Sequence, residues 1–135
     1  MTKVSGSCLC GNVGYSGETE VKMVINCHCT DCQKATGSVH GTLVFVGEDG
    51  MTFTGDPGEF EHPADSGNVL TKVFCKDCGS QVAGRNTARV GVIGLRAGTL
   101  DQKDLIEPGF NVFCDSAVPT TPMSDGTKKF PRMPG

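Results

Sequence analysis

Short hydrophobic runs, separated by glycines and polar residues, recur along the whole chain. The runs are rich in Val, Ile, Thr and Phe, and their lengths suit strands better than helices. Turn signals follow one another at short intervals, which indicates an all-β architecture. We predict strands over residues 23–26, 42–46, 51–54, 69–74, 80–83, 90–95 and 110–113.

Turn and helix signals lie between these runs. Residues 10–12 (CGN) and 48–50 (EDG) predict hairpin turns, because Gly, Asn and Asp tolerate the backbone angles of tight turns. The pattern predicts one short helix over Thr30–Thr36, with Thr30 as its N-cap and Gly37 at its end.

The stretch from residue 118 to residue 135 differs from the rest in composition. It holds four of the seven prolines, so we expect an irregular segment. The segment is either a disordered tail or an ordered arm laid across the domain. Phe130 beside Pro131 favours the arm, because a packed aromatic ring can anchor it.

Size and charge narrow the class of protein. With 135 residues we expect a single domain spanning residues 1–135. The net charge of −3 argues against a nucleic-acid partner, which favours a basic surface. Apolar runs such as residues 43–46 are too short to span a membrane, and the first residues lack the hydrophobic stretch of a signal peptide. We therefore expect a cytoplasmic protein without a membrane or nucleic-acid partner.

Eight cysteines are the strongest chemical signal in the sequence. An even count also fits a secreted disulfide scaffold. Three features argue against that class: the absence of a secretion signal, a length that needs no covalent staples, and the grouping of the cysteines. A metal-binding function fits this grouping better.

Two of the groups together predict a structural zinc site. Cys8 and Cys10 form a CxC pair, and on a strand residues i and i+2 face the same way. Cys75 and Cys78 form a CxxC pair followed by Gly79, which is half of a zinc knuckle. Four sulfurs from the two pairs fit one closed tetrahedral zinc site. Buried free thiols, or pairing of Cys8 and Cys10 with the middle group, remain the alternatives.

The middle group, CHCTDC, predicts a second zinc site. Its three sulfurs are those of Cys27, Cys29 and Cys32, and they leave the fourth zinc position open for a substrate. A thiol substrate suits a metal that already binds sulfur. The alternative is a closed structural site completed by Cys114, His28 or His40. We expect His28 to face away from the metal as a surface or second-shell residue, and His40 and His62 to be ordinary surface histidines.

The order of these motifs resembles the glutathione-dependent formaldehyde-activating enzyme family, which includes the centromere-protein-V-like proteins. The resemblance covers nearly the whole chain. Its motifs are residues 6–11 (GSCLCG), 27–34 (CHCTDCQK), 74–80 (FCKDCGS), 97–101 (AGTLD), 107–108 (EP), 111–119 and 130–131 (FP).

The resemblance implies a fold, two metals and an activity. The implied fold is an Mss4-like β-tent of small antiparallel sheets organised around zinc. Cys8, Cys10, Cys75 and Cys78 match the family's structural zinc ligands, and Cys27, Cys29 and Cys32 match its second, catalytic zinc site. The implied activity is that of a carbon–sulfur lyase, which joins glutathione and formaldehyde as S-hydroxymethylglutathione. The implied partner is thus a small thiol such as glutathione.

Two positions depart from the family pattern. Asn111 stands where the late strand commonly carries His, and the chain has no Trp after the proline of that strand. We expect these positions at the mouth of the site, where they would alter the substrate. Arg85, Arg89 and Arg96 are candidate partners for the carboxylates of glutathione, or else solubilising charges.

Three functions therefore compete. The first is a zinc-dependent enzyme of thiol-adduct chemistry, and the second is a zinc-stabilised protein-binding module without catalysis. The third is a thiol redox sensor, in which CHCTDC oxidises and releases its zinc.

Overall fold

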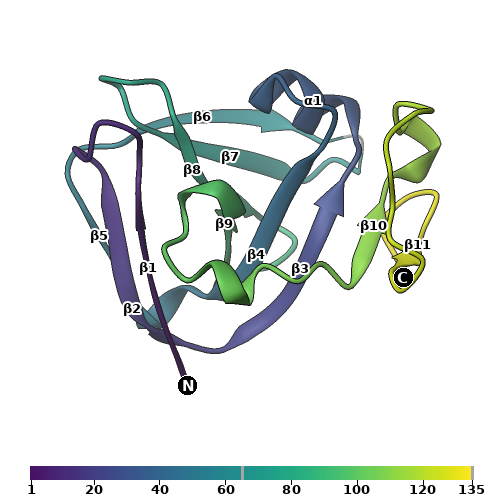
Figure 1. Ribbon diagram of the computed structural model, residues 1–135. Helices are drawn as coiled ribbons and strands as arrows, with labels where there is room; N and C mark the ends of the chain where they lie inside the picture. Colours follow the sequence, from purple (N-terminus) through teal and green to yellow (C-terminus); the bar gives the residue numbers. More distant parts are fainter. Residues whose placement is uncertain (65, 135) are drawn as a thin grey trace.

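The computed structural model describes residues 1–64 and 66–134 and contains two β-sheets (Figure 1). The smaller sheet has the order β1 (Thr2–Ser7), β2 (Gly14–Thr19), β5 (Met51–Thr54). The larger sheet has the order β11 (Lys128–Lys129), β10 (Phe110–Val112), β3 (Val21–Cys27), β4 (Gly41–Gly47), β9 (Val92–Arg96), β8 (Gln81–Asn86), β7 (Val69–Phe74), β6 (Gly58–Pro63). The all-β prediction is confirmed.

The pairing is antiparallel except at one edge of the larger sheet. There β10 runs parallel to both β3 and β11, which departs from the expected all-antiparallel arrangement. In Figure 1 the β1–β2–β5 sheet lies on one side of the interior, and β3 and β4 lie on the other. Strands β6 and β7 run across the top of the view.

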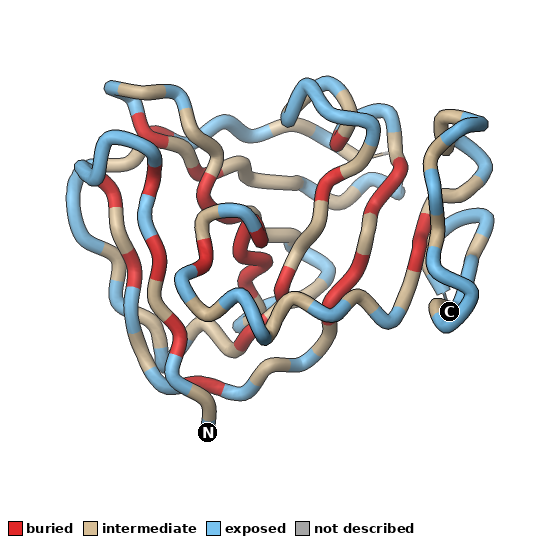
Figure 2. Tube along the Cα trace, in the orientation of Figure 1, coloured by how far each residue is buried: buried red, intermediate tan, exposed pale blue. Residues whose placement is uncertain are grey.

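The main core lies between the two sheets, as the buried segments in Figure 2 show. Val44 and Val46 of β4 point into it and are fully buried, together with Ile93 and Leu95 of β9. Side chains alternate along a strand, so the intervening Leu43 and Phe45 face the opposite side of the sheet. That side carries a second hydrophobic cluster, which also contains Cys27 and Cys32.

Helix α1 (Thr30–Thr36) has the predicted bounds, but a different residue caps it. The N-cap is Cys29, whose sulfur accepts a hydrogen bond from the backbone N–H of Cys32, so the expectation for Thr30 is wrong. Gly37 ends the helix in the left-handed conformation at φ 73°, as predicted.

Four short 3₁₀ helices complete the described elements: η1 (Glu48–Gly50), η2 (Ala97–Thr99), η3 (Lys103–Leu105) and η4 (Cys114–Ser116). The hairpin predicted at residues 48–50 is wrong, because η1 joins β4 to β5 and these strands belong to different sheets. The turn at residues 10–12 does lie in a hairpin, between β1 and β2. Within the described residues, no helix combines the length and hydrophobicity needed to cross a membrane.

Part of the proline-rich C-terminal segment pairs with the larger sheet. Strand β11 lies along β10, and the Phe130 ring packs against Phe110 with centroids 5.8 Å apart. The backbone N–H of Cys114 donates to the carbonyl of Phe130, and the N–H of Phe130 donates to that of Asn111. These contacts hold residues 128–130 beside β10. Strand β10 in turn pairs with β3, which ends at Cys27.

Candidate metal centres

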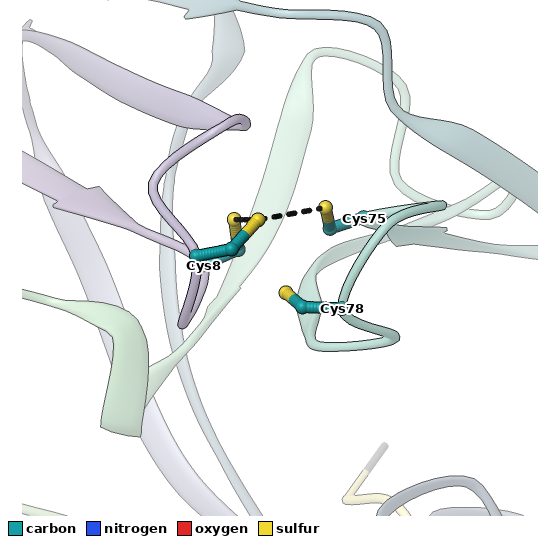
Figure 3. A group of neighbouring side chains, drawn as sticks. Cys8, Cys75 and Cys78 are labelled. Carbon is teal, nitrogen blue, oxygen red and sulfur yellow. Dashed lines mark hydrogen bonds between the residues drawn. The ribbon is translucent and has the colours of Figure 1, made fainter.

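Four cysteines from two distant turns come together at one end of the molecule. Cys8 and Cys10 follow β1, and Cys75 and Cys78 lie in the turn between β7 and β8. Their sulfurs all lie within 4.8 Å of one another. Figure 3 shows the sulfurs of Cys8, Cys75 and Cys78 directed toward one another from these two segments. The structure thus brings together the four cysteines that the sequence grouped, although the CxC pair lies in a turn rather than on a strand.

Backbone hydrogen bonds shape both turns around the sulfurs. The N–H of Val13 donates to Cys8 Sγ at 3.3 Å, and the N–H of Gly79 donates to the carbonyl of Cys75 at 2.8 Å. Gly79 has φ 78°, a conformation that a side chain disfavours. Asn12 Nδ2 donates to Asp77 Oδ2 at 2.8 Å and so ties one turn to the other.

The spacing of these sulfurs fits a tetrahedral metal. Cys10 Sγ lies 3.7 Å from the sulfurs of both Cys8 and Cys75. Zinc–sulfur bonds of about 2.3 Å in a tetrahedron place sulfurs about 3.8 Å apart. A hydrogen bond from Ser80 is the main cause that lowers the pKa of Cys78 to about 5, toward the thiolate that a metal requires. The four residues therefore can hold a metal ion such as zinc.

The three-cysteine cluster lies at the start of α1. Cys27 ends β3, Cys29 caps the helix and Cys32 is its buried residue. The sulfurs of Cys27 and Cys29 are 3.4 Å apart, and all three lie within 4.8 Å of one another. Cys27 and Cys32 are buried while Cys29 is partly exposed. This cluster also has a donor set suited to zinc.

Charge and hydrogen bonding favour the thiolate at one member of this cluster. Hydrogen bonds from Cys27 and Cys29 lower the pKa of Cys32 to about 2, and the positive charges of Arg96 and Lys72 add to the effect. The same hydrogen bonding raises the pKa of Cys27. Of the three thiols, Cys32 is therefore the one whose surroundings favour the thiolate.

Among the described residues, no fourth His, Cys, Asp or Glu joins the three-cysteine group within the same 4.8 Å. Cys114 starts η4, and its sulfur donates to the carbonyl of Asn111 at 3.4 Å. His28 is fully buried and its Nε2 lies 2.8 Å from Asn111 Oδ1. Of the two positions expected for His28, the surface one is therefore wrong. A buried position next to the ligand cysteines, without contact to the metal, agrees with the structure. Asn111 is also buried, so it does not lie at a site mouth.

The other two histidines are not ordinary surface residues either. His40 packs its ring 5.0 Å from the His28 ring, and its Nδ1 is buried. Burial is the main cause that lowers the pKa of His40. His62 lies in a groove, with Nδ1 4.0 Å from Asp31 Oδ2.

This groove lies between α1 and strands β6 and β7 and has a volume of about 600 Å³. Lys34 and Lys72 supply positive charge, Asp31 supplies negative charge, and Phe60 and Phe74 supply apolar surface. None of the three cysteines lines the groove, but the charge of Lys72, which does line it, also acts on Cys32. No sequence pattern singled out this groove, because its lining comes from α1, β6, β7, the turn after β7 and the start of β8.

The structure separates the three arginines that the sequence could not distinguish. Arg85 pairs with Glu48 at 3.0 Å and with Glu59 at 3.4 Å. Arg89 lies over the Phe45 ring, 5.5 Å from its centroid. Arg96 alone of the three is buried, at 6% exposed, and it lies close to the three-cysteine cluster.

Comparison with known proteins assigns the chain to a family. The sequence model of the glutathione-dependent formaldehyde-activating enzyme family matches residues 3–116, and the chain belongs to this family. No curated protein matches the chain significantly. A crystal structure of a Rhodobacter sphaeroides protein is similar in fold, with a TM-score of 0.57 and 19% sequence identity. The match covers 77% of this chain and 96% of that one.

Proposed function

We propose that the protein is a zinc-dependent carbon–sulfur lyase-type enzyme that handles the adduct of a small thiol and a small aldehyde. The family to which the chain belongs supports glutathione and formaldehyde as the substrates. The single observation that carries the proposal is that the cluster has three cysteines. Among the described residues, no fourth His, Cys, Asp or Glu joins it. A substrate thiol can take that fourth place.

The two clusters have different roles in this proposal. Cys8, Cys10, Cys75 and Cys78 hold a structural zinc that ties the β1–β2 hairpin to the β7–β8 turn. Cys27, Cys29 and Cys32 hold the catalytic zinc beside the groove. A zinc ion there would lower the pKa of an incoming thiol and keep it as the thiolate, which is the nucleophilic form.

The reaction needs little beyond a positioned thiolate. The sulfur of glutathione adds to the carbonyl carbon of formaldehyde, a carbon–sulfur bond forms, and the carbonyl π electrons move to oxygen. The proton lost by the thiol ends on that oxygen as S-hydroxymethylglutathione forms. The reverse reaction breaks the same carbon–sulfur bond.

The groove supports a zwitterionic thiol as the substrate. Glutathione has two carboxylates and one ammonium group. Lys34 and Lys72 complement the carboxylates, and Asp31 complements the ammonium. Because the charge of Lys72 reaches both the groove and Cys32, a ligand in the groove would have its sulfur near the cluster.

Native mass spectrometry tests the proposal by counting metals per chain with and without millimolar glutathione. We expect two zinc ions, and a glutathione adduct that disappears in Cys29→Ser, which loses the second zinc. S-methylglutathione is the matched ligand control, because it keeps both carboxylates and lacks the thiol. Two bound zinc ions without any glutathione adduct would contradict the proposal and favour a protein-binding module. Loss of one zinc on mild peroxide treatment, with a new disulfide and no glutathione adduct, would favour the redox sensor.

A further inference from the structure

Arg96 is a buried cation without a hydrogen-bond partner for two of its nitrogens. It is the last residue of β9, and its Nε and Nη1 atoms are buried with no acceptor among the described residues. Burying a charge without a partner is unfavourable, and an isolated guanidinium does not give up its proton. The position of Arg96 therefore implies a neighbouring anion, and no carboxylate of the described residues pairs with it.

The three-cysteine cluster is the neighbouring source of negative charge. Gly41 of β4 pairs with Cys27 in the sheet and leaves room for the guanidinium. A Cβ atom at Gly41 would lie 2.6 Å from Arg96 Nη1 and 3.7 Å from Cys32 Sγ. The guanidinium and the buried sulfur thus share the small space above this glycine.

The charge of the cluster depends on its fourth ligand. Three thiolates around one divalent zinc have a net charge of −1, and a fourth thiolate raises this to −2. Excess negative charge in a buried site requires a counter-charge close by. A neighbouring positive charge matters less for the four-cysteine cluster. This cluster lies in turns, and its Cys10 is exposed to water.

We propose that Arg96 is the counter-charge that allows the three-cysteine site to accept an anionic thiolate as its fourth ligand. The inference rests on the proposed function and makes Arg96 a residue that determines affinity for the ionised thiol. Lys72, which lines the groove, is the second positive charge that acts on Cys32. Arg85 and Arg89 have partners of their own within the fold.

Glutathione binding to cobalt-loaded protein tests this role, because sulfur-to-cobalt charge-transfer absorption reports the added thiolate directly. Arg96→Met removes the charge and keeps much of the volume, whereas Arg96→Lys keeps the charge. Arg85→Met is the control, since it also removes one arginine from a neighbouring strand. Should Arg96→Met fail to fold, Arg96→Gln has the same expected result and supplies neutral donors to the buried space.

We expect Arg96→Met to bind both metals and to bind glutathione about tenfold or more weakly, the loss typical of a hydrogen bond to a charged group. Arg96→Lys should lose less, and Arg85→Met should match the wild type. Unchanged glutathione affinity in Arg96→Met with both metals present would overturn the inference. Loss of the second metal in Arg96→Met but not in Arg96→Lys would also overturn it, because Arg96 would then support the three cysteines themselves. If glutathione does not change the charge-transfer absorption of the wild-type protein, the result would instead contradict the proposed function.

Discussion

His28 and Asn111 form a buried hydrogen bond that joins the three-cysteine cluster to the C-terminal segment. His28 Nε2 lies 2.8 Å from Asn111 Oδ1, and both residues are almost inaccessible to solvent. On its other side, Asn111 Nδ2 donates to Thr127 Oγ1, which itself donates to the carbonyl of Ser124. This chain of donors fixes the orientation of the Asn111 amide. It follows that His28 has its proton on Nε2 and a bare lone pair on Nδ1.

We therefore predict that the neutral Nε2–H tautomer dominates at His28. Long-range ¹⁵N–¹H correlation spectra distinguish the two neutral tautomers of histidine and can be compared among the three histidines. The pattern of an Nδ1–H tautomer at His28 would contradict the hydrogen-bond chain. Thr127→Val is the informative variant, because it removes the group that orients the Asn111 amide while it leaves His28 in place.

Asn111→Leu should destabilise the fold. The substitution has a similar volume but leaves the buried Nε2–H of His28 without an acceptor, which costs about 1–3 kcal/mol of unfolding free energy. Chemical denaturation of the zinc-loaded protein measures the change. A variant as stable as the wild type would indicate that water replaces the lost amide oxygen.

Two of the predicted strands agree with the structure at both ends. Met51–Thr54 and Val69–Phe74 have the observed bounds of β5 and β7. Strands β1, β2, β6 and β11 were not predicted. Strand β6 exposes most of its side chains, including Phe60 at 60% exposed, so it lacks the apolar alternation that marks a half-buried strand.

The cysteine spacing predicted which residues within each motif come together, because ligand spacing within a motif is a local property of the chain. The contact of the CxC pair with the CxxC pair spans 65 residues, and the spacing alone left another pairing open. The polar environment of the sites was not predictable in the same way. His28 and Asn111 are 83 residues apart, and only the parallel pairing of β10 with β3 brings them into contact. Likewise, the sequence offered three arginines and no means to tell that Arg96 is the buried one.

Loss of the structural metal should weaken the fold more than loss of the second metal. Cys75→Ser removes a buried ligand from the cluster that joins two distant turns. Cys29→Ser changes a partly exposed ligand beside one short helix. We expect thermal unfolding at a clearly lower temperature for Cys75→Ser than for Cys29→Ser, with one zinc lost in each. Equal unfolding temperatures would contradict the assignment of the four-cysteine cluster as the structural one.

The single tyrosine should report on alkaline unfolding. Burial raises the pKa of Tyr15 to about 12 from an ordinary value near 10, although its hydroxyl lies 2.8 Å from Thr99 Oγ1. A raised folded-state pKa means that the contribution to stability is complete below pH 10 and is lost as the pH rises toward about 12. The ultraviolet absorbance of tyrosinate should therefore titrate near pH 12 in the folded protein. Titration near pH 10 without unfolding would show that the ring is accessible.

The same pKa shift predicts a pH-dependent difference between the wild type and Tyr15→Phe. Phenylalanine has no proton to lose, so the unfolding free energy of the variant should decline less between pH 10 and pH 12. Tyr15→Phe also loses the hydrogen bond to Thr99, which lowers its stability at neutral pH by about 1 kcal/mol. The two stability curves should therefore converge as the pH rises. Parallel curves would contradict the shift.

Gly17 and Gly98 offer a matched pair of glycine substitutions that tests how closely β2 contacts η1. A Cβ atom at Gly17 of β2 would overlap the backbone carbonyl oxygen of Gly50, which cannot move without shifting η1. At Gly98 in η2 a Cβ atom would meet nothing within 4 Å, and its backbone has no positive φ. Gly17→Ala should therefore cost about 1–3 kcal/mol of unfolding free energy. Gly98→Ala should change it by less than about 0.5 kcal/mol. Denaturant titration of both variants at full zinc occupancy measures the difference, and equal effects would mean that β2 and η1 are not in close backbone contact in solution.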